Sequence, residues 1–576
     1  MDNIIFLILR RMRAPLLVLI ITYTIAVIGL TLIPGLDSDG NIYRMSVFHA
    51  LYFVAFMSTT IGFGEVPYEF TDGQRLWVLF CIFATVVVWI YAIGTLISLL
   101  QDKTFQRAIT ERRFKGTVRR VPDPFYLVCG YGQTGSALIR ALTDRNQHAV
   151  TIDIDEQRIS LLKIENHREY VPALCADARR PEHLCEAGLK HPSCAGVVAL
   201  TNVNETNLTI AIAAKLMHPE IKVICRADSH DIEANMASFG TDHIYDPFDA
   251  FALYLATALQ APGVTLLYEW LTGRRHEPLK DPIYPPTKGL WILCGFGRFG
   301  KAVYAYLSKA EDIELVVVEE TPERTGSPAD GVIEGRGTEA DTLQQAGIGR
   351  AVGLVAGTDN DANNLSIIMT AHDINADIFV VARENHLDNQ DLFDAVNADI
   401  IMHPSSIIAD RIRVLLGTPL LTEFEYQARF QGDAWACELV IRIAALVDEH
   451  VPEVWEITID EKEAYALCEF EKKGARILVQ TLLQDPRDRD NELHAIALML
   501  LRNDQRELLP KSEKLLRHGD KLLFCGREEA RGRMEWTQQN RHALSYILTG
   551  SSEPEGTVWR WLTRLLHTNR RATNSH

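Results

Sequence analysis

Residues 125–135 read FYLVCGYGQTG, an apolar run of five residues that leads directly into three closely spaced glycines. The apolar run predicts a buried strand, and the residues that follow predict a helix from Ser136 to Leu142. Between a strand and a helix, the first two glycines permit a tight turn and a close backbone approach to a pyrophosphate, and the third permits close helix–strand packing. The positive end of the helix dipole would face the phosphate. The candidate binding residues of this loop are Gly130, Gly132, Gln133, Thr134 and Gly135.

The pattern occurs a second time: residues 290–300 read LWILCGFGRFG and precede a predicted helix from Lys301 to Leu307. Further pairs follow in the same order, among them LCEAG at 184–188 with LQQAG at 343–347, and NL at 207–208 with NL at 364–365, where each asparagine is expected to open a helix. Matches in a fixed order over about 125 residues indicate a duplicated domain. The candidate binding residues of the second loop are Gly295, Gly297, Arg298, Phe299 and Gly300.

Each copy continues with a second apolar strand that ends in an acid, Asp153 in the first copy and Glu319 in the second. An acid at this place accepts hydrogen bonds from the ribose hydroxyls, which favours NAD or another adenine nucleotide over NADP. Strands that alternate with helices predict a parallel, doubly wound sheet in each copy. The alternative for either copy is a vestigial Rossmann-like domain with an empty site.

Two uncharged stretches near the N-terminus, residues 14–36 and 76–100, are long enough as helices to cross the ~30 Å core of a bilayer. A signal peptide is the alternative for the first stretch, but its apolar run is too long. Arginines precede the first stretch and several lysines and arginines follow the second, whereas the connecting loop is mainly acidic. Because basic residues favour the cytoplasmic side, both termini are expected in the cytoplasm.

The connecting loop contains an apolar and aromatic segment, residues 43–57, that is too short to span and predicts a re-entrant helix. Directly after it, residues 58–65 read STTIGFGE. Non-helical backbone is tolerated at membrane depth where it lines a water-filled path. Alternate glycines let successive carbonyls turn to one side, and four such segments would replace the hydration shell of a potassium ion with rings of oxygen. One segment per chain therefore requires four chains.

Residues 60–64 resemble the selectivity-filter signature of potassium channels, Thr-x-Gly-Tyr/Phe-Gly. The resemblance implies a filter made by Thr60, Ile61, Gly62, Phe63 and Gly64, in which the first four carbonyls and the threonine hydroxyl coordinate the ion. Phe63 stands where tyrosine is commoner, and Glu65 stands where aspartate is commoner. A weakly selective cation channel of the same architecture is therefore the alternative.

The duplicated region, about residues 122–250 and 288–405, resembles the RCK family, also called KTN or TrkA-N. With a two-helix pore in front of it, the chain is similar to the prokaryotic tandem-RCK potassium channels. The resemblance implies a homotetramer in a bacterial or archaeal cell membrane, with a cytoplasmic gating ring that binds nucleotides or divalent cations. No catalytic residue of a dehydrogenase accompanies the glycine loops, so no enzyme activity is expected.

The expected fold class is a membrane α-helical pore of two spans and a re-entrant helix, then two α/β Rossmann-like RCK domains, then a small α+β C-terminal lobe. The expected divisions are a pore domain at 1–104, a linker at 105–121, a first RCK N-lobe at 122–250, an interlobe helical segment at 251–287, a second N-lobe at 288–415, a C-terminal lobe at 416–550, and a final helix and tail at 551–576.

Two single residues carry weaker expectations. Gly94, inside the second apolar stretch, serves either as a gating hinge or as a small residue for close helix packing. Asp228 occupies a place where some calcium-gated relatives carry a ligand carboxylate. The alternative for Asp228 is a solvated surface acid, as it is for Glu205 and Asp242.

The net charge of −17 argues against a nucleic-acid partner. It suits a protein that meets cations, and equally a surface that is merely soluble. Two other classes of protein stay open. A membrane-anchored NAD oxidoreductase would need a proton donor near the nicotinamide, and none stands out. A regulatory subunit of a potassium transporter would need no filter of its own.

Overall fold

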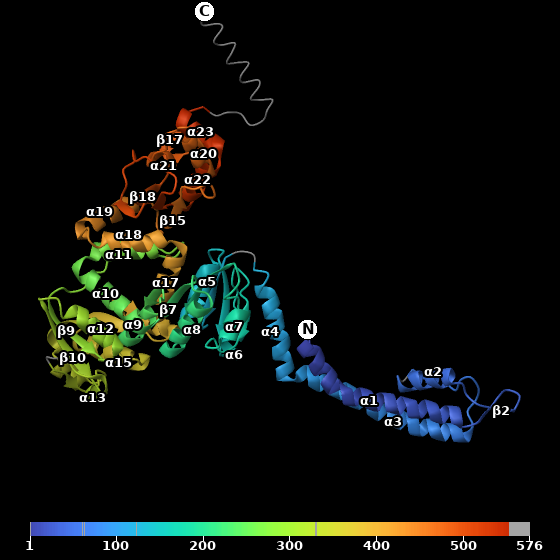
Figure 1. Ribbon diagram of the computed structural model, residues 1–576. Helices are drawn as coiled ribbons and strands as arrows, with labels where there is room; N and C mark the ends of the chain where they lie inside the picture. The colour runs from blue at the N-terminus through green and yellow to red at the C-terminus, as the bar shows by residue number, and fades with distance from the viewer. Residues whose placement is uncertain (1, 60, 63, 122–123, 329–330, 552–576) are drawn as a thin grey trace, which may run out of the picture. The chain divides into compact units, whose positions relative to one another are not determined.

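The computed structural model describes residues 2–59, 61–62, 64–121, 124–328 and 331–551 (Figure 1). The chain divides into two compact units, residues 1–121 and residues 122–576. The final helix and tail expected at residues 551–576 lie outside the described residues after residue 551.

Two long helices, α1 (Asp2–Leu32) and α3 (Asp72–Gln101), pack side by side in the first unit (Figure 1). Both contain a stretch that is long and apolar enough to cross a membrane. α1 ends at Leu32, earlier than the predicted end at residue 36, because Pro34 has no N–H and disfavours helical angles at the residue before it. The residues ahead of the predicted first span simply extend α1.

A hairpin and a short helix connect the two spans. The hairpin pairs β1 (Gly35–Leu36) with β2 (Ile42–Tyr43), and the helix is α2 (Val47–Ser58), which begins within the predicted re-entrant segment. The apolar face of α2 packs into a buried cluster with Ala26 and Leu30 of α1. After α3, the predicted linker is helical: α4 covers Lys103–Val118.

The close approach of α1 and α3 depends on one glycine. A Cβ atom at Gly29 would lie 2.1 Å from Cε2 of Trp77, so only glycine admits the indole at this height. The same indole donates from Nε1 to the carbonyl oxygen of Ala26 at 3.2 Å. A small residue on one helix therefore receives the largest side chain of the other, which is a common way for membrane helices to pack.

The first half of the second unit is a six-stranded parallel sheet in the order β5-β4-β3-β6-β7-β8. Its strands are β3 (Phe125–Cys129), β4 (His148–Asp153), β5 (Ala173–Cys175), β6 (Cys194–Ala199), β7 (Lys222–Arg226) and β8 (His243–Tyr245). Its helices are α5 (Gln133–Thr143), α6 (Glu156–Ile164), α7 (Pro181–Glu186), α8 (Asn204–Met217) and α9 (His230–Ser238). This order is that of the doubly wound dinucleotide-binding fold and confirms the predicted parallel sheet.

The second half repeats the arrangement in the order β11-β10-β9-β12-β13-β14. Its strands are β9 (Gly289–Cys294), β10 (Ile313–Glu319), β11 (Ile333–Glu334), β12 (Ala351–Ala356), β13 (Phe379–Arg383) and β14 (Ile400–Met402). Its helices are α12 (Arg298–Leu307), α13 (Pro322–Thr325), α14 (Ala340–Gln345), α15 (Asp361–Ile374) and α16 (Gln390–Ala395), with 3-10 turns at Ile348–Arg350 and Leu387–Asn389. The two halves are therefore one topology used twice.

The two halves exchange their last helices. α10 (Pro247–Gln260) follows the first sheet but packs on α12 of the second half, where Phe251 and Leu255 lie in one buried cluster with Phe299. α17 (Pro404–Gly417) follows the second sheet but packs on α5 of the first half, through Ile412 and the buried face of that helix. Each fully buried side chain of this kind stabilises the fold by roughly 1.5–3 kcal/mol. The exchange therefore binds both halves into one body.

A smaller lobe completes the unit. Its antiparallel sheet has the order β15-β20-β18-β19, beside a hairpin of β16 and β17. Its strands are β15 (Glu453–Thr458), β16 (Gln484–Asp485), β17 (Asp488–Glu492), β18 (Ala495–Arg502), β19 (Gln505–Leu508) and β20 (Lys521–Gly526). Among the described residues, seven helices pack on this sheet. One of them, α11 (Pro262–Thr272), comes earlier in the chain and follows α10. The others are α18 (Pro419–Ala428), α19 (Asp433–Ala444), α20 (Tyr465–Lys472), α21 (Val479–Leu483), α22 (Glu528–Gln539) and α23 (Arg541–Thr549). The helices α11, α18 and α19 cover one face of the sheet, and α20 to α23 cover the other.

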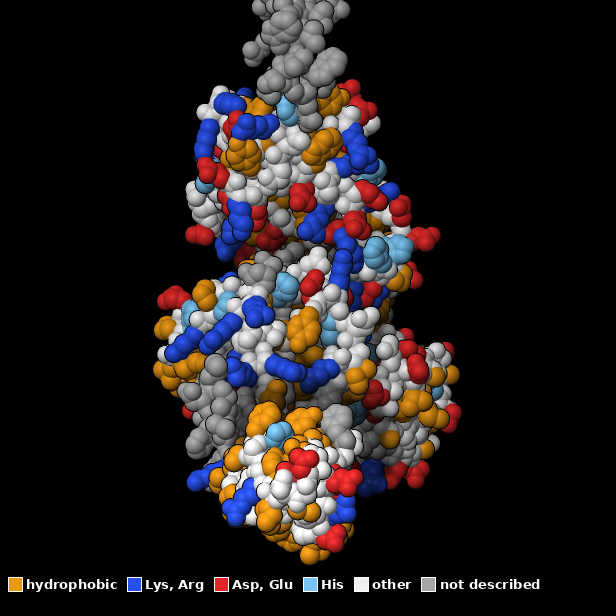
Figure 2. All heavy atoms as spheres, turned by 90° about the vertical axis from the view of Figure 1, so that its right-hand side faces the viewer, with side chains coloured by type: hydrophobic (Ala, Val, Ile, Leu, Met, Phe, Trp, Pro, Cys, Tyr) orange, Lys and Arg blue, Asp and Glu red, His pale blue; other side chains and the backbone are white. Residues whose placement is uncertain are grey.

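The surface of this lobe carries charges of both signs, seen interspersed at the top of Figure 2. Several form ion pairs, such as Lys473 with Glu469 at 2.7 Å and Arg527 with Asp448 at 2.6 Å. Exposed pairs of this kind contribute about 0–1 kcal/mol each, so they solubilise the lobe more than they stabilise it.

Replacement of Gly300 by alanine tests the packing at the start of α12. A Cβ atom there would lie 2.0 Å from the carbonyl oxygen of Gly295, whereas one at Gly297 would meet no described atom within 4 Å. We expect Gly300→Ala to lower the free energy of unfolding by about 1–3 kcal/mol or more, because strand and helix must move apart. The matched Gly297→Ala variant should lower it by less, about 0.5–1 kcal/mol, because alanine is a poorer N-cap than glycine. Equal losses in denaturant unfolding would contradict this reading.

Candidate functional site

The segment after α2 holds the predicted filter. Thr60 and Phe63 lie outside the described residues, and Ile61, Gly62 and Gly64 are described. Gly62 has a φ of +67° and Gly64 a φ of +97°, values that glycine adopts without strain. The N–H of Ile61 donates to the carbonyl oxygen of Phe56 at 3.0 Å and so attaches the segment to α2.

A chain of side-chain hydrogen bonds holds the end of α2 between the two spans. The hydroxyl of Ser58, directly before the filter segment, lies 2.5 Å from the Tyr23 hydroxyl on α1. Nε1 of Trp89 on α3 donates to that same Tyr23 hydroxyl at 2.9 Å. Neither Tyr23 nor Trp89 is predicted from the sequence, because the partners lie 35 and 66 residues apart and no local pattern marks them.

The unusual glutamate after the filter has a firm partner in the same unit. Arg75 on α3 donates from Nε to Oε1 of Glu65 at 3.0 Å and from Nη2 to Oε2 at 3.2 Å. The N–H of Phe70 donates to Oε2 at 2.8 Å. Bidentate pairing of this kind fixes geometry as well as charge, so the chain that leaves the filter is tied to the start of α3.

Gly94 lies in the exposed part of α3, and a Cβ atom there would meet no described atom within 4 Å. Close packing within this chain therefore does not require glycine at this place. Its use as a hinge stays a prediction.

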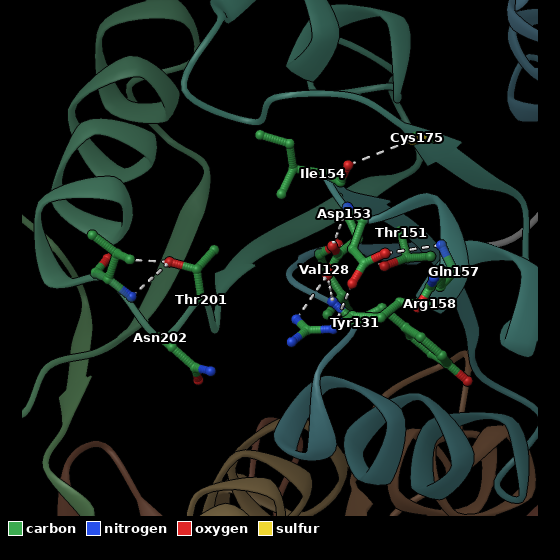
Figure 3. A network of polar contacts seen from close by, with 12 residues as sticks. Val128, Tyr131, Thr151, Asp153, Ile154, Gln157, Arg158, Cys175, Thr201 and Asn202 are labelled. Atoms are coloured by element: carbon green, nitrogen blue, oxygen red, sulfur yellow. Dashed lines mark hydrogen bonds and ion pairs between the residues drawn. The ribbon is translucent and has the colours of Figure 1, made fainter.

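In the first glycine loop, the acid at the end of β4 lies against the backbone of the glycine turn (Figure 3). Asp153 is 5% exposed and accepts from the N–H of Tyr131 at 2.5 Å and from the N–H of Asp155 at 2.8 Å. Nη1 of Arg158, on α6, lies 3.7 Å from the same carboxylate. This arginine, which the sequence did not single out, places a positive charge beside the turn.

The three glycines of this loop play different parts. Gly130 has a φ of +106° and makes the turn after β3. Gly132 is the N-cap of α5, so the N–H groups of the residues after it lie at the positive end of the helix. A Cβ atom at Gly135 would lie 2.0 Å from the carbonyl oxygen of Gly130. Gln133 and Thr134 open α5.

The second loop reproduces this geometry. Glu319 is 8% exposed and accepts from the N–H of Phe296 at 2.5 Å and from the N–H of Thr321 at 3.0 Å. Gly295 has a φ of +95°, and Gly297 caps α12. Both halves therefore place the amides at the start of a helix beside a carboxylate, the arrangement with which doubly wound folds bind a pyrophosphate and a ribose.

A buried asparagine fixes the opposite side of each turn. Asn364 accepts from the N–H and hydroxyl of Thr358 and donates to the carbonyl oxygens of Thr358 and Arg383, at 2.7–3.0 Å. Asn207 makes the equivalent four bonds in the first half, to Thr201 and to the carbonyl of Arg226. The sequence predicts a helix that opens at each asparagine. That prediction is wrong, because α8 and α15 begin earlier, at Asn204 and Asp361, and the asparagines sit within the first turns as clamps.

Each glycine loop also contacts the other half. Arg298 of the second loop pairs with Asp228, which is 7% exposed, and its guanidinium lies over the ring of Phe248 at 5.4 Å. In the first loop, Oε1 of Gln133 accepts from the hydroxyl of Ser405 on α17 at 3.4 Å.

The same pairing bears on the expected calcium site. Asp228 is buried beside an arginine, and Asp242 lies 2.8 Å from Nζ of Lys215, so neither is a free surface acid. Among the described residues, no group of three or more acidic, histidine or cysteine side chains is arranged to hold a metal ion. The described part of the chain thus gives calcium no support.

A buried acid and a histidine meet at the carboxyl edge of the second sheet. Glu384, directly after β13, is 1% exposed, and its Oε2 lies 3.1 Å from Nδ1 of His403, the N-cap of α17. Burial raises the pKa of Glu384 to about 7, helped by the charges of Asp361 and Asp394. Burial lowers the pKa of His403, although the charges of Asp394 and Asp361 act in the opposite direction. Near neutral pH the Glu384 carboxyl is therefore only partly ionised, and the imidazole of His403 is mainly neutral.

Comparison with known proteins agrees with this layout. Residues 16–102 match the ion channel family, and residues 126–247 and 291–404 match the TrkA-N domain. The probable potassium channel protein 2 of Methanocaldococcus jannaschii is 23% identical over 43% of this chain and 67% of its own length. Potassium channel protein 1 of the same organism is 23% identical over 38% of this chain and 63% of its own. The solved GsuK channel bound to NAD aligns with 93% of this chain and 99% of its own, at 16% identity and a TM-score of 0.46.

The chain is thus an ion-channel domain followed by two TrkA-N domains. It is homologous to the archaeal potassium channel proteins.

The raised pKa of Glu384 predicts how the stability of the fold depends on pH. Its pKa is raised in the folded protein, so between about pH 4.5 and 7 the folded state holds a proton that the unfolded chain has released. This contribution to stability is fully present below pH 4.5 and is lost as the pH rises through 7. We expect Glu384→Gln to remove that part of the decline, so that its unfolding midpoint gains on the wild type between pH 5 and pH 8. The exposed Glu320→Gln is the control, and parallel pH profiles for all three proteins would rule the effect out.

Proposed function

We propose that the chain is one of four identical subunits of a potassium channel in a bacterial or archaeal cell membrane, with both termini in the cytoplasm. Its first unit supplies two spans and the filter of Thr60, Ile61, Gly62, Phe63 and Gly64 for passive potassium conduction. Its second unit binds NAD or an ADP-type nucleotide at the two glycine loops and sets the open probability. The chain performs no enzymatic reaction in this proposal.

The backbone of Gly62 and Gly64 is the observation that carries the proposal. Both have positive φ, and they directly follow an apolar helix of 12 residues that lies between two spans. Left-handed glycines at alternate positions allow neighbouring carbonyls to point the same way, which is what a ring of coordinating oxygens needs. The Ser58–Tyr23–Trp89 hydrogen bonds support the proposal, because they hold the end of that helix in place.

Nucleotide gating is supported by the doubled loop geometry. Each loop offers helix-start amides beside a buried acid, Asp153 or Glu319. Four chains bring eight such halves, enough for a ring on the cytoplasmic side, with α4 as the coupling element and Gly94 as the hinge. The energy available for gating is only the difference in ligand affinity between the closed and open ring shapes.

A weakly selective cation channel of the same architecture is the second candidate. One feature favours it: Phe63 has no hydroxyl that could brace the filter from behind. Reversal potentials in mixed potassium and sodium distinguish the two candidates.

Replacement of Gly62 by alanine should abolish potassium conduction, since L-residues rarely adopt a φ of +67° and the carbonyls would turn. The matched control is Gly40→Ala, a glycine with a φ of +84° in the loop between the spans. It carries similar strain and should leave conduction intact. Single-channel currents in planar bilayers measure both. Normal potassium currents from Gly62→Ala would contradict the assignment of this segment as the selectivity filter.

Removal of the acid from either loop should weaken nucleotide gating. Asp153→Asn and Glu319→Gln each lose a charged acceptor for ribose hydroxyls, which corresponds to about 10- to 100-fold in affinity. The controls are Glu156→Gln and Glu320→Gln, which change exposed acids close by. Open probability is measured in bilayers against NAD and against ADP. Wild-type open probability that is identical with and without both nucleotides would exclude this form of gating.

A further inference from the structure

Tyr131, which lies between the first two glycines of the first loop, is held at both of its ends. Its N–H donates to the carboxylate of Asp153, and Figure 3 shows the two residues side by side. Its hydroxyl donates to Oε2 of Glu165 at 2.8 Å, and Nε2 of His167 lies 3.0 Å from the same hydroxyl oxygen. The tyrosine is only 4% exposed. A displacement of the buried hydroxyl is therefore transmitted to the backbone of the glycine turn.

Both partners of this hydroxyl belong to the segment between α6 and β5. Glu165 is the C-cap of α6, and its Oε2 lies 3.6 Å from Nη2 of Arg140 on α5. The N–H of His167 donates to the carbonyl oxygen of Glu165 at 3.2 Å, and the imidazole is 5% exposed. The Tyr131 hydroxyl thus connects the glycine turn with the flanks of two helices.

The hydrogen-bond partners decide which nitrogen of His167 carries the proton. A carboxylate only accepts, so the single hydroxyl proton of Tyr131 goes to Glu165. The hydroxyl oxygen is then the acceptor, and Nε2 of His167 donates to it. Nδ1 of the same ring is buried and has no hydrogen-bond partner among the described residues. The arrangement therefore suits a neutral imidazole with its proton on Nε2.

Protonation of this imidazole would add an N–H group at Nδ1, where the described residues offer no acceptor. A buried donor without a partner is unfavourable, so the protonated ring fits its place less well than the neutral ring. The charged groups that face the ring are Glu165, Arg140 on α5, and Asp144, the C-cap of α5. Burial lowers the pKa of His167 and Arg140 adds to this, whereas Glu165 and Asp144 act in the opposite direction.

The second glycine loop has no counterpart of this contact. Phe296 stands where the first loop has Tyr131, and its N–H donates to Glu319 as that of Tyr131 donates to Asp153. The phenylalanine ring has no hydroxyl, and it lies edge-on to the ring of Tyr304. The chain therefore contains two glycine loops with the same contact to an acid, and the first of them is connected to a titratable histidine.

We propose that His167 is a positioning residue for nucleotide binding by the first glycine loop. Its neutral imidazole holds the Tyr131 hydroxyl and, through it, the glycine turn. Protonation of the imidazole releases the hydroxyl, and the first loop then binds its nucleotide less tightly. The second loop does not respond in this way. The inference rests on the proposed function, because it assumes that the loops bind nucleotides.

The test measures the affinity of the full chain in detergent for NAD by calorimetry at pH 7.5 and pH 5.5. These values lie on either side of the ordinary histidine pKa of about 6.5. Glu319→Gln weakens the second loop and so isolates the first, and Asp153→Asn isolates the second. In the Glu319→Gln protein we expect an affinity about 3- to 10-fold lower at pH 5.5, since one proton changes an equilibrium by at most about 10-fold for each pH unit. In the Asp153→Asn protein we expect no comparable fall.

His167→Gln, added to the Glu319→Gln protein, tests the histidine itself. The amide of glutamine can donate to the Tyr131 hydroxyl but does not titrate. We expect this variant to keep at pH 5.5 the affinity that it has at pH 7.5. The matched control is His218→Gln, which changes a half-buried histidine at the end of α8 in the same half and should leave the pH dependence in place.

Amide hydrogen exchange of residues 130–135 without nucleotide separates a failure of this inference from a failure of the proposed function. After correction for the intrinsic exchange rate, we expect these amides to lose protection at pH 5.5 in the wild type but not in His167→Gln. If NAD binds at neither pH, the proposed nucleotide binding fails, and the exchange experiment alone decides on the role of His167.

The inference is rejected if the first loop binds NAD equally well at both pH values, or if the second loop shows a fall of the same size. It is also rejected if His167→Gln retains the pH dependence, in affinity or in exchange. If His167→Gln fails to fold, judged by its unfolding midpoint, Tyr131→Phe takes its place, because the second loop already carries phenylalanine there. Without the hydroxyl, the affinity should be the same at both pH values, and a persisting fall rejects the inference.

Discussion

Neither Rossmann-like half covers its own glycine helix. The outer face of α5 is apolar and is closed by α17 of the other half, while that of α12 is closed by α10. Each half alone would expose this face to water, at a cost of roughly 25 cal/mol for every Å² of apolar surface. The exchange is therefore obligatory for both halves, and the start of each binding helix is positioned by a segment that belongs to the other repeat.

This exchange places each glycine loop in contact with the opposite half. Arg298 reaches Asp228, and Gln133 reaches Ser405 on the exchanged helix. The two contacts occupy equivalent positions, because Gln133 and Arg298 are the first residues of α5 and α12. One contact is a neutral hydrogen bond and the other is an ion pair with a buried acid. The duplicated loops thus share backbone geometry but differ in charge.

The sequence was sufficient to predict the parallel sheets, both glycine turns and the acids at the ends of β4 and β10, because each depends on a local pattern. Gly130 and Gly295 mark turns whose backbone angles only glycine adopts easily, and such constraints are visible in one short stretch. Tyr23 and Trp89 could not be found this way, since the contact of Tyr23 with both Ser58 and Trp89 depends on how three helices pack. The exchange of α10 and α17 could not be predicted either, because the pattern of an amphipathic helix indicates which face it buries but not which element covers that face. The two buried asparagines, Asn207 and Asn364, were predicted only in part. Their repetition was clear, but their place inside the helix was not.

The inter-half contacts limit what a nucleotide could do in these loops. A phosphate at the start of α12 would lie near Arg298, whose guanidinium is held by Asp228 and by the ring of Phe248. A ligand that took the guanidinium would leave the buried Asp228 with the charge of Arg226 nearby, and because the side chain of Arg298 is 59% exposed, the loss costs less than the value for a fully buried pair, about 3–5 kcal/mol. A ligand that left the pair intact would lose nothing there and would shift nothing. Phosphate binding at the second loop therefore moves the two halves only if it replaces this pair with contacts of comparable strength. At the first loop, a bound phosphate would have to replace only the neutral hydrogen bond between Gln133 and Ser405, which requires less binding free energy.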